Sequence, residues 1–204
     1  MNNIARSRGV SMIETMLALP ILLMLGLGIV HLGLIYQAKA NLEYAALMAA
    51  RVGASSSIDI DEMKREVKRR MKAADLRSGN LDDVSVVEIS ILNPDTSAFN
   101  DFGGPPSDGA ACASSYSNSC EIPNDNLMFR PTNTESSGLN IQDANILRIK
   151  VTYAYDTKVP LMKAFNKDMD VEGVESGVEL TAYATVRMQS PARITNNNLA
   201  YFAN

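Results

Sequence analysis

The sequence predicts an α+β protein in which a long N-terminal helix carries a small antiparallel sheet. Three observations lead to this fold class. The first is an apolar run that contains no full charge between Glu14 and Lys39. The second is a segment of strong helix formers that continues this run without a break. The third is a pair of later segments, 147–155 and 178–188, in which apolar and polar residues alternate as in strands with one buried face.

The apolar run has the length of a membrane span. Residues 15–36 number about 22, which is enough for a helix to cross the hydrocarbon core of a bilayer. Arg6 and Arg8 add positive charge on the N-terminal side, and no acid precedes Glu14. Because flanking cations favour the cytoplasmic side, we expect a single-pass inner-membrane protein with its N-terminus in the cytoplasm and its C-terminal domain in the periplasm.

A secretory signal is the alternative interpretation of the same run. Ala38-Lys39-Ala40 has the form of a signal-peptidase site, and cleavage after Ala40 would release a soluble domain. Hydrophobic regions of such signals are shorter, about 7–15 residues. The length of the run therefore favours an anchor over a cleaved signal.

Four residues inside the span are candidates for contact with neighbouring helices. Pro20 removes one backbone donor, and Gly26, Gly28 and Gly33 permit close approach of another helix. Ordinary membrane helices are also rich in glycine and proline, so composition alone explains them equally well. The single histidine, His31, is interpreted as a packing or interfacial residue rather than a ligand.

The helix should continue beyond the membrane as a stem. Residues 37–51 are mostly strong helix formers, and Gly53 with the serines at 55–57 forms a plausible stop. Residues 10–54 form this predicted transmembrane and stem segment, and a helix from Val10 to Val52 would be about 65 Å long. The remaining residues, 55–204, form the predicted extracytoplasmic α+β domain.

A second, amphipathic helix is predicted at about 59–77, with Asp59 as its N-cap. Its buried face has helical spacing: Ile60, Met63, Val67 and Met71. Its other faces are basic: Lys64, Arg65, Lys68, Arg69, Arg70 and Lys72. A solvated surface is the simplest interpretation, and contact with membrane lipid headgroups or an acidic partner is the alternative. Nucleic acid is not an expected partner, because no aromatic platforms accompany the bases and the net charge is −4.

Three strands are predicted, at 84–92, 147–155 and 178–188, in a sheet of about three to four strands that lies on a helix. The intervening stretch 93–144 is rich in Gly, Pro and Ser and is predicted to be an irregular loop. Within it, Cys112 and Cys120 are expected to form a disulfide if the domain is exported. The Asn-rich tail, 195–204, is predicted to be flexible.

Enzymatic chemistry is not expected from this sequence. The only histidine lies in the apolar run, so a nucleophilic triad has no base, and no Cys or His cluster has zinc spacing. No glycine-rich phosphate loop is present. We therefore predict no catalytic residue, no metal site and no cofactor.

Glu14 needs a partner if it enters the membrane, because a lone carboxylate there is disfavoured. An interfacial position near the positive end of the helix dipole is the simplest explanation. The alternative begins with cleavage between Gly9 and Val10, which would make Glu14 the fifth residue of the mature chain. Its carboxylate could then pair with the new amino terminus of an adjacent helix and set the register of an assembly.

These residues resemble a known signal and a known family. Gly9 after a basic tip, Glu14 and the apolar run look like the signal cut by prepilin peptidases. Together with Pro20, the segment 49–54, the paired strands and Pro160-Leu161-Met162, they resemble the TadE-like minor pilins, or pseudopilins, of tight-adherence, type IV-like pili.

The resemblance implies a structural function in pilus assembly. Residues 1–9 would be a leader peptide removed by a prepilin peptidase, and the N-terminal helix would anchor the subunit in the inner membrane. The implied partners are other pilin subunits, bound through their N-terminal helices, and the inner-membrane assembly platform. A single-span periplasmic binding or sensor protein remains the alternative function.

Overall fold

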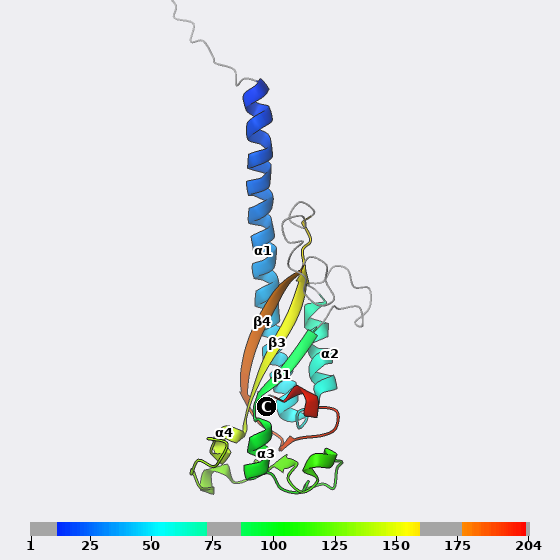
Figure 1. The fold of residues 1–204 in the computed structure, drawn as a ribbon, viewed down its shortest axis with the longest axis vertical. Helices are drawn as coiled ribbons and strands as arrows, with labels where there is room; N and C mark the ends of the chain where they lie inside the picture. The colour runs from blue at the N-terminus through cyan, green and yellow to red at the C-terminus, as the bar shows by residue number, and fades with distance from the viewer. Residues whose placement is uncertain (1–11, 73–86, 160–176, 203–204) are drawn as a thin grey trace, which may run out of the picture.

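The computed structural model describes residues 12–72, 87–159 and 177–202 (Figure 1). A helix of 44 residues, α1 (Met12–Ser55), is followed by α2 (Ile60–Met71), which packs beside its C-terminal half. A three-stranded antiparallel sheet contains β1 (Val87–Asn93), β3 (Ile146–Asp156) and β4 (Gly177–Arg187), in the order β1-β3-β4. The predicted α+β class is confirmed.

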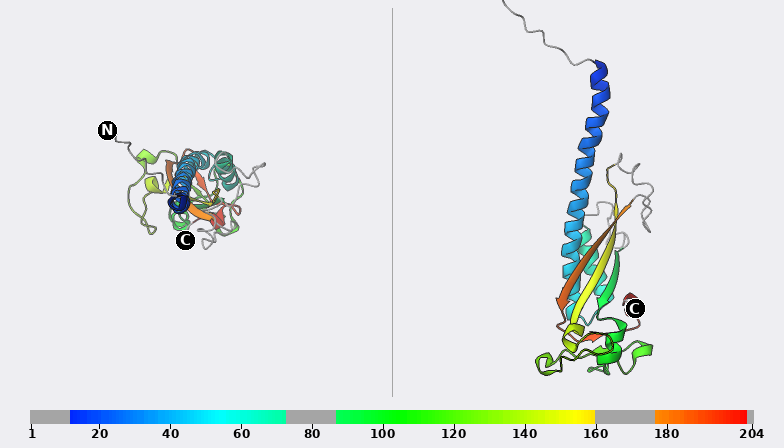
Figure 2. Two further views of the ribbon diagram at one scale, coloured as in Figure 1. Left: turned by 90° about the horizontal axis from the view of Figure 1, so that it is seen from above. Right: turned by 60° about the vertical axis from the view of Figure 1, so that its left-hand side comes forward.

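The sheet lies against the C-terminal half of α1 with one face buried, as Figure 2 shows from two directions. Every second residue of β3 from Leu147 to Tyr155 is buried, as the alternation predicted. In β4 the inward positions Leu180, Ala182 and Ala184 are buried, whereas Tyr183 is exposed. β1 runs to Asn93, and residues 84–86 of the predicted strand lie outside the described residues.

Small side chains allow α1 to approach both the sheet and α2. Its buried face consists mainly of alanine: Ala38, Leu42, Ala45, Ala46, Ala49, Ala50 and Ala54. At Gly53 an added methyl group would lie 2.6 Å from Met63 Sδ and 3.1 Å from Leu147 Cδ2. α1, α2 and β3 therefore meet most closely at this glycine.

The end of α1 is a left-handed turn built without glycine. The amide of Ile58 donates to the carbonyl of Gly53 at 2.9 Å, and Ser57 and Ile58 have φ angles of 54° and 65°. This is the arrangement of a Schellman motif, in which glycine is the usual left-handed residue. The carbonyl of Ala54 accepts hydrogen bonds from the amides of Gln189 and Ser190, so the segment after β4 completes the cap.

α2 begins where the sequence predicted. The side chain of Asp59 accepts hydrogen bonds from the amides of Asp61 and Glu62, at 2.9 and 3.2 Å. The helix ends at Met71, earlier than the predicted end at residue 77, and residues 73–77 lie outside the described part of the chain.

The prediction of an irregular loop over 93–144 is wrong in part. Short elements follow one another here: α3 (Thr96–Phe102), η2 (Ser114–Tyr116), β2 (Glu121–Ile122), η3 (Leu127–Phe129) and α4 (Ile141–Ala144). The stretch docks on the domain because it buries apolar side chains of its own, such as Phe99 and Ile122. β2 also pairs with β5 (Ala192–Arg193), far along the chain.

The prediction of a flexible tail is wrong for residues 195–202. Asn198 is buried, and a 3-10 turn, η4 (Leu199–Tyr201), follows it. The ring of Phe202 meets that of Phe99 edge to face, with centroids 5.4 Å apart. Asparagine-rich composition suggested mobility, but buried hydrogen bonds and this aromatic pair order the segment.

Candidate functional site

The N-terminal half of α1 projects from the domain as an exposed apolar helix (Figure 1). Its large side chains are exposed, among them Met12 at 79%, Ile29 at 72% and Tyr36 at 78%. Among the described residues this is the one helix long and apolar enough to cross a membrane, with a mean hydropathy of 2.3 in its best window. Residues 12–36 extend about 37 Å, which exceeds a hydrocarbon core of about 30 Å. These properties are those of a single-pass membrane protein.

Glu14 lies in the first turn of α1 and is exposed. It makes no ion pair with another described residue. Its position near the positive end of the helix dipole is favourable for a carboxylate. Gly9 and Val10, the predicted processing site, lie outside the described residues, and their relation to Glu14 stays a prediction.

The three glycines of the span have open space around them. A methyl group added at Gly26, Gly28 or Gly33 would meet no atom within 4 Å, unlike one added at Gly53. Packing within this chain therefore does not require glycine at these positions. Pro20 stands inside α1 without ending it.

The exposed and packed halves of α1 meet near His31 and Lys39. His31 is buried, with 7% of its surface exposed, which agrees with its interpretation as a packing residue. Lys39 Nζ donates to the backbone carbonyl of Thr181 on β4 and lies 3.4 Å from Glu43 Oε1. This hydrogen bond thus connects the edge strand β4 to α1 directly after the apolar segment.

Several basic residues of α2 make contacts within the molecule. Glu66 is buried and binds two arginines, with Arg69 Nη2 at 2.6 Å and Arg70 Nε at 2.8 Å. Arg70 also lies over the ring of Tyr44 on α1, 5.0 Å from its centroid. The hydrogen bond to Glu66 and the nearby negative charges raise the pKa of Arg70 above its usual value, against the opposing effect of burial. Lys64 Nζ donates to Tyr201 Oη at 2.6 Å.

At the far end of the domain from the exposed helix, Cys112 and Cys120 form the predicted disulfide. Next to it, Arg193 Nη2 lies 2.6 Å from the buried Glu121 carboxylate and 3.0 Å from Asp108. Burial lowers the pKa of Arg193, but its hydrogen bonds to Glu121 and Asp108 outweigh this and raise the pKa overall. This ion pair leaves no local signal in the sequence, because its partners are 72 residues apart.

Two of the pockets among the described residues have volumes suited to a ligand. One, of about 350 Å³, lies between the turn after α1 and the 193–198 segment and is lined mostly by polar residues, among them Ser57 and Asn198. The other, of about 410 Å³, lies between η3, α4 and the adjoining ends of β3 and β4. Within the described ranges no group of three His, Cys, Asp or Glu side chains is placed to hold a metal ion.

The comparisons with known proteins agree with the resemblance noted in the sequence. The TadE-like protein family matches residues 9–51, which include Glu14 and most of α1. No curated protein and no solved structure matches the chain. Residues 9–51 are therefore a TadE-like segment, and with the apolar helix they fit a membrane protein associated with a Tad pilus.

Proposed function

We propose that this protein is a minor pilin or pseudopilin, a structural and assembly subunit of a tight-adherence, type IV-like pilus. α1 inserts in the inner membrane with its N-terminus in the cytoplasm, and the α+β domain stands in the periplasm. A prepilin peptidase removes residues 1–9, and subunits then pack through their N-terminal helices. The subunit works in assembly and carries no catalytic residue.

The exposed half of α1 is the observation that carries this proposal. A helix with Leu32 and Tyr36 at 67% and 78% exposure needs lipid or protein around it. Glycines with open space where a side chain would stand suit close contact with a second helix. Glu14 is exposed in the first turn of α1. Its partner in the proposal is the new amino terminus, at Val10, of an adjacent subunit.

Mass spectrometry of the native protein, together with a charge variant, tests the proposal. We expect a mature N-terminus at Val10, and we expect Glu14→Gln to insert and be cleaved but to fail in pilus incorporation. The matched control is Glu43→Gln, because Glu43 is an exposed acid on the same helix whose recorded ion pair, with Lys39, lies within α1. Normal incorporation of Glu14→Gln would remove the charge-pairing mechanism.

A periplasmic binding or sensor protein is the second candidate. The polar pocket of about 350 Å³, lined in part by Ser56, Asp59 and Asn196, is the observation in its favour. An intact Met1 beside an active prepilin peptidase, with no pilus phenotype on deletion, would support it. A mature N-terminus at Asn41 would instead indicate secretion, although α1 runs unbroken through Ala40, between the buried residues Ala38 and Leu42.

A further inference from the structure

Two adjacent apolar side chains protrude from the end of the domain opposite the exposed helix. Met128 and Phe129, in η3, are 83% and 81% exposed. Outside α1, the described residues expose only one other large hydrophobic side chain, Tyr183. Most of the domain surface is polar, so an exposed Met-Phe pair there marks a contact site for protein.

The turn that carries this pair is held in place by side-chain hydrogen bonds. Arg130 binds both the carboxylate and the carbonyl of Asp125, at 2.9 and 3.1 Å. Gln142 Nε2 donates to the carbonyl of Leu127 at 2.9 Å and to that of Arg130 at 3.3 Å. Leu127 itself is buried. Because the turn is preorganised, little conformational freedom would be lost when Phe129 is captured.

An apolar pocket of about 410 Å³ lies next to this turn. Its apolar lining comes from Leu127, Ile146 and Val186. The rest of the wall is polar or charged: Gln142, Asp143, Thr185 and Arg187. The Oε1 atom of Gln142 is buried without a hydrogen-bond partner among the described residues. The volume is within the range of pockets that bind small organic groups, about 300–1,000 Å³, and exceeds what one aromatic ring needs.

We propose that two copies of this chain pair through these features, with Phe129 of each copy inserted into the pocket of the other. We call the exposed pair Met128-Phe129 the knob. Leu127 precedes the knob in η3 and also lines the pocket, so knob and pocket belong to one surface patch. A patch that carries both complementary parts can bind its own copy about a two-fold axis.

The position of the patch suits two copies anchored in one membrane, and in this respect the inference rests on the proposed function. η3 and α4 lie at the end of the molecule opposite the exposed half of α1 (Figures 1 and 2). Two subunits with parallel stems therefore present knob and pocket at the same height. Arg187 and Asp143 border the pocket, and Asp125 and Arg130 flank the knob, so both sides offer charges of both signs at the rim.

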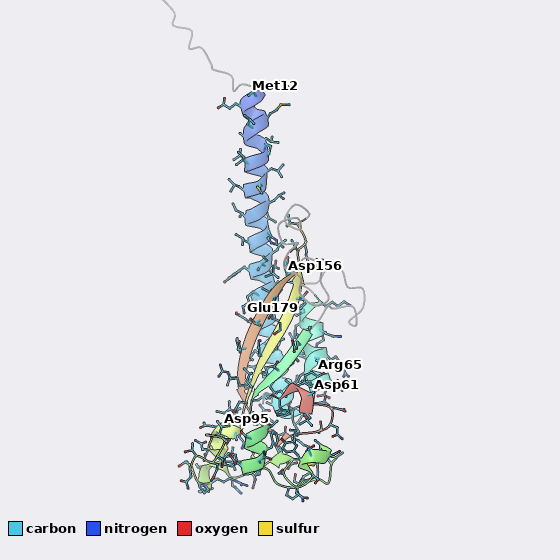
Figure 3. All side chains as sticks on the ribbon, viewed as in Figure 1. Met12, Asp61, Arg65, Asp95, Asp156 and Glu179 are labelled. Atoms are coloured by element: carbon cyan, nitrogen blue, oxygen red, sulfur yellow. A yellow bond between two sulfur atoms is a disulfide. The ribbon has the colours of Figure 1, made fainter. Side chains whose placement is uncertain are left out.

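Site-specific photo-cross-linking of the full-length chain tests this pairing. Benzoylphenylalanine replaces Phe129, and the purified protein is irradiated in proteoliposomes. We expect a cross-linked dimer whose junction, mapped by mass spectrometry, joins position 129 to the segments 142–146 or 185–187 of the second copy. The control places the same probe at Arg65, an exposed residue on α2, and should give little dimer (Figure 3).

A pocket variant separates specific pairing from random collision. Thr185 is exposed on β4 and lines the pocket, so Thr185→Arg should fill the pocket without disturbing the core. We expect the 129 cross-link to fall about tenfold or more, whereas Thr185→Ser should leave it unchanged. Absence of a dimer, a junction elsewhere, or an equal yield in Thr185→Arg would overturn the proposal.

The outcome is distinguishable from failure of the pilin assignment. Processing at Val10 and pilus incorporation report on the N-terminal helix, and Thr185→Arg should leave the processing unchanged. If the 129 cross-link forms but deletion of the protein gives no pilus phenotype, the pilin assignment alone is refuted. Irradiation in cells that captures only a different protein at position 129 would overturn self-pairing alone.

Discussion

Asn198 donates a hydrogen bond from Nδ2 to the backbone carbonyl of Ile58, at 2.9 Å, and so connects the tail of the chain to the turn after α1. The same nitrogen donates to the carbonyl of Arg193 at 2.9 Å, and Oδ1 accepts from the amide of Thr195 at 2.7 Å. The residue is 1% exposed. One buried amide thus satisfies three backbone groups from two distant segments.

Loss of this amide should destabilise the domain. In Asn198→Ala one buried and two half-buried backbone groups lose this partner, and an unsatisfied buried group costs about 1–3 kcal/mol before water or local rearrangement compensates. We expect the free energy of unfolding of the full-length protein in detergent to fall by about 2–4 kcal/mol. Asn197→Ala, at the exposed neighbouring position, should change it by less than about 0.5 kcal/mol. Equal effects of the two variants would show that the hydrogen bonds of Asn198 contribute little.

Gly103 and its neighbour Gly104 offer a matched pair for a test of packing. A methyl group at Gly103 would lie 2.2 Å from the carbonyl oxygens of Phe99 and Ser119, whereas one at Gly104 would meet nothing within 4 Å. Because backbone must move in the first case, Gly103→Ala should destabilise the protein by about 1–3 kcal/mol or more. Gly104→Ala should be close to neutral. Chemical denaturation measures both, and a neutral Gly103→Ala would contradict the tight contact between α3 and the segment before Cys120.

Ser57 occupies a left-handed position that glycine adopts more easily. With φ at 54°, its side chain adds strain that glycine does not have. Ser57→Gly keeps the backbone amide that donates to Ser190 Oγ at 2.8 Å. We therefore expect Ser57→Gly to raise the thermal midpoint and to stabilise the protein by about 0.5–1 kcal/mol. The same exchange at Ser55, which is helical, should lower stability, so a loss of stability in both variants would argue against a strained turn.

Asp108 should make stability depend on pH in the acid range. A hydrogen bond from the amide of Ala110, followed by the contact with Arg193, lowers the pKa of this carboxyl below its ordinary 3.8. A lowered pKa means that the unfolded chain binds the proton more readily, so the stabilisation is present above pH 3.8 and disappears as pH falls through the folded pKa. We expect the stability difference between the native chain and Asp108→Asn to shrink from pH 5 to about pH 2. A difference that stays constant over this range would exclude the carboxylate as its source.

Local pattern in the sequence was sufficient for the main helices and strands. The apolar run and the helix formers after it predicted α1, and strict alternation predicted the buried face of β3. The cap at Asp59 and the disulfide between Cys112 and Cys120 were also predicted correctly. These features depend on residues close together in the chain, where spacing and composition carry the information.

What the sequence determined by itself was the character of the N-terminal segment: a similarity to TadE-like proteins over residues 9–51 and a helix apolar enough for a membrane. Only the tertiary structure decided the order of 93–144 and of the tail, the Glu121–Arg193 ion pair, and the apolar pocket beside Phe129. The physical reason is the long separation of the partners, 72 residues for Glu121 and Arg193 and 140 for Ile58 and Asn198. Local periodicity in the sequence does not predict such contacts, because they form only when the sheet, α1 and the distal segments are packed together.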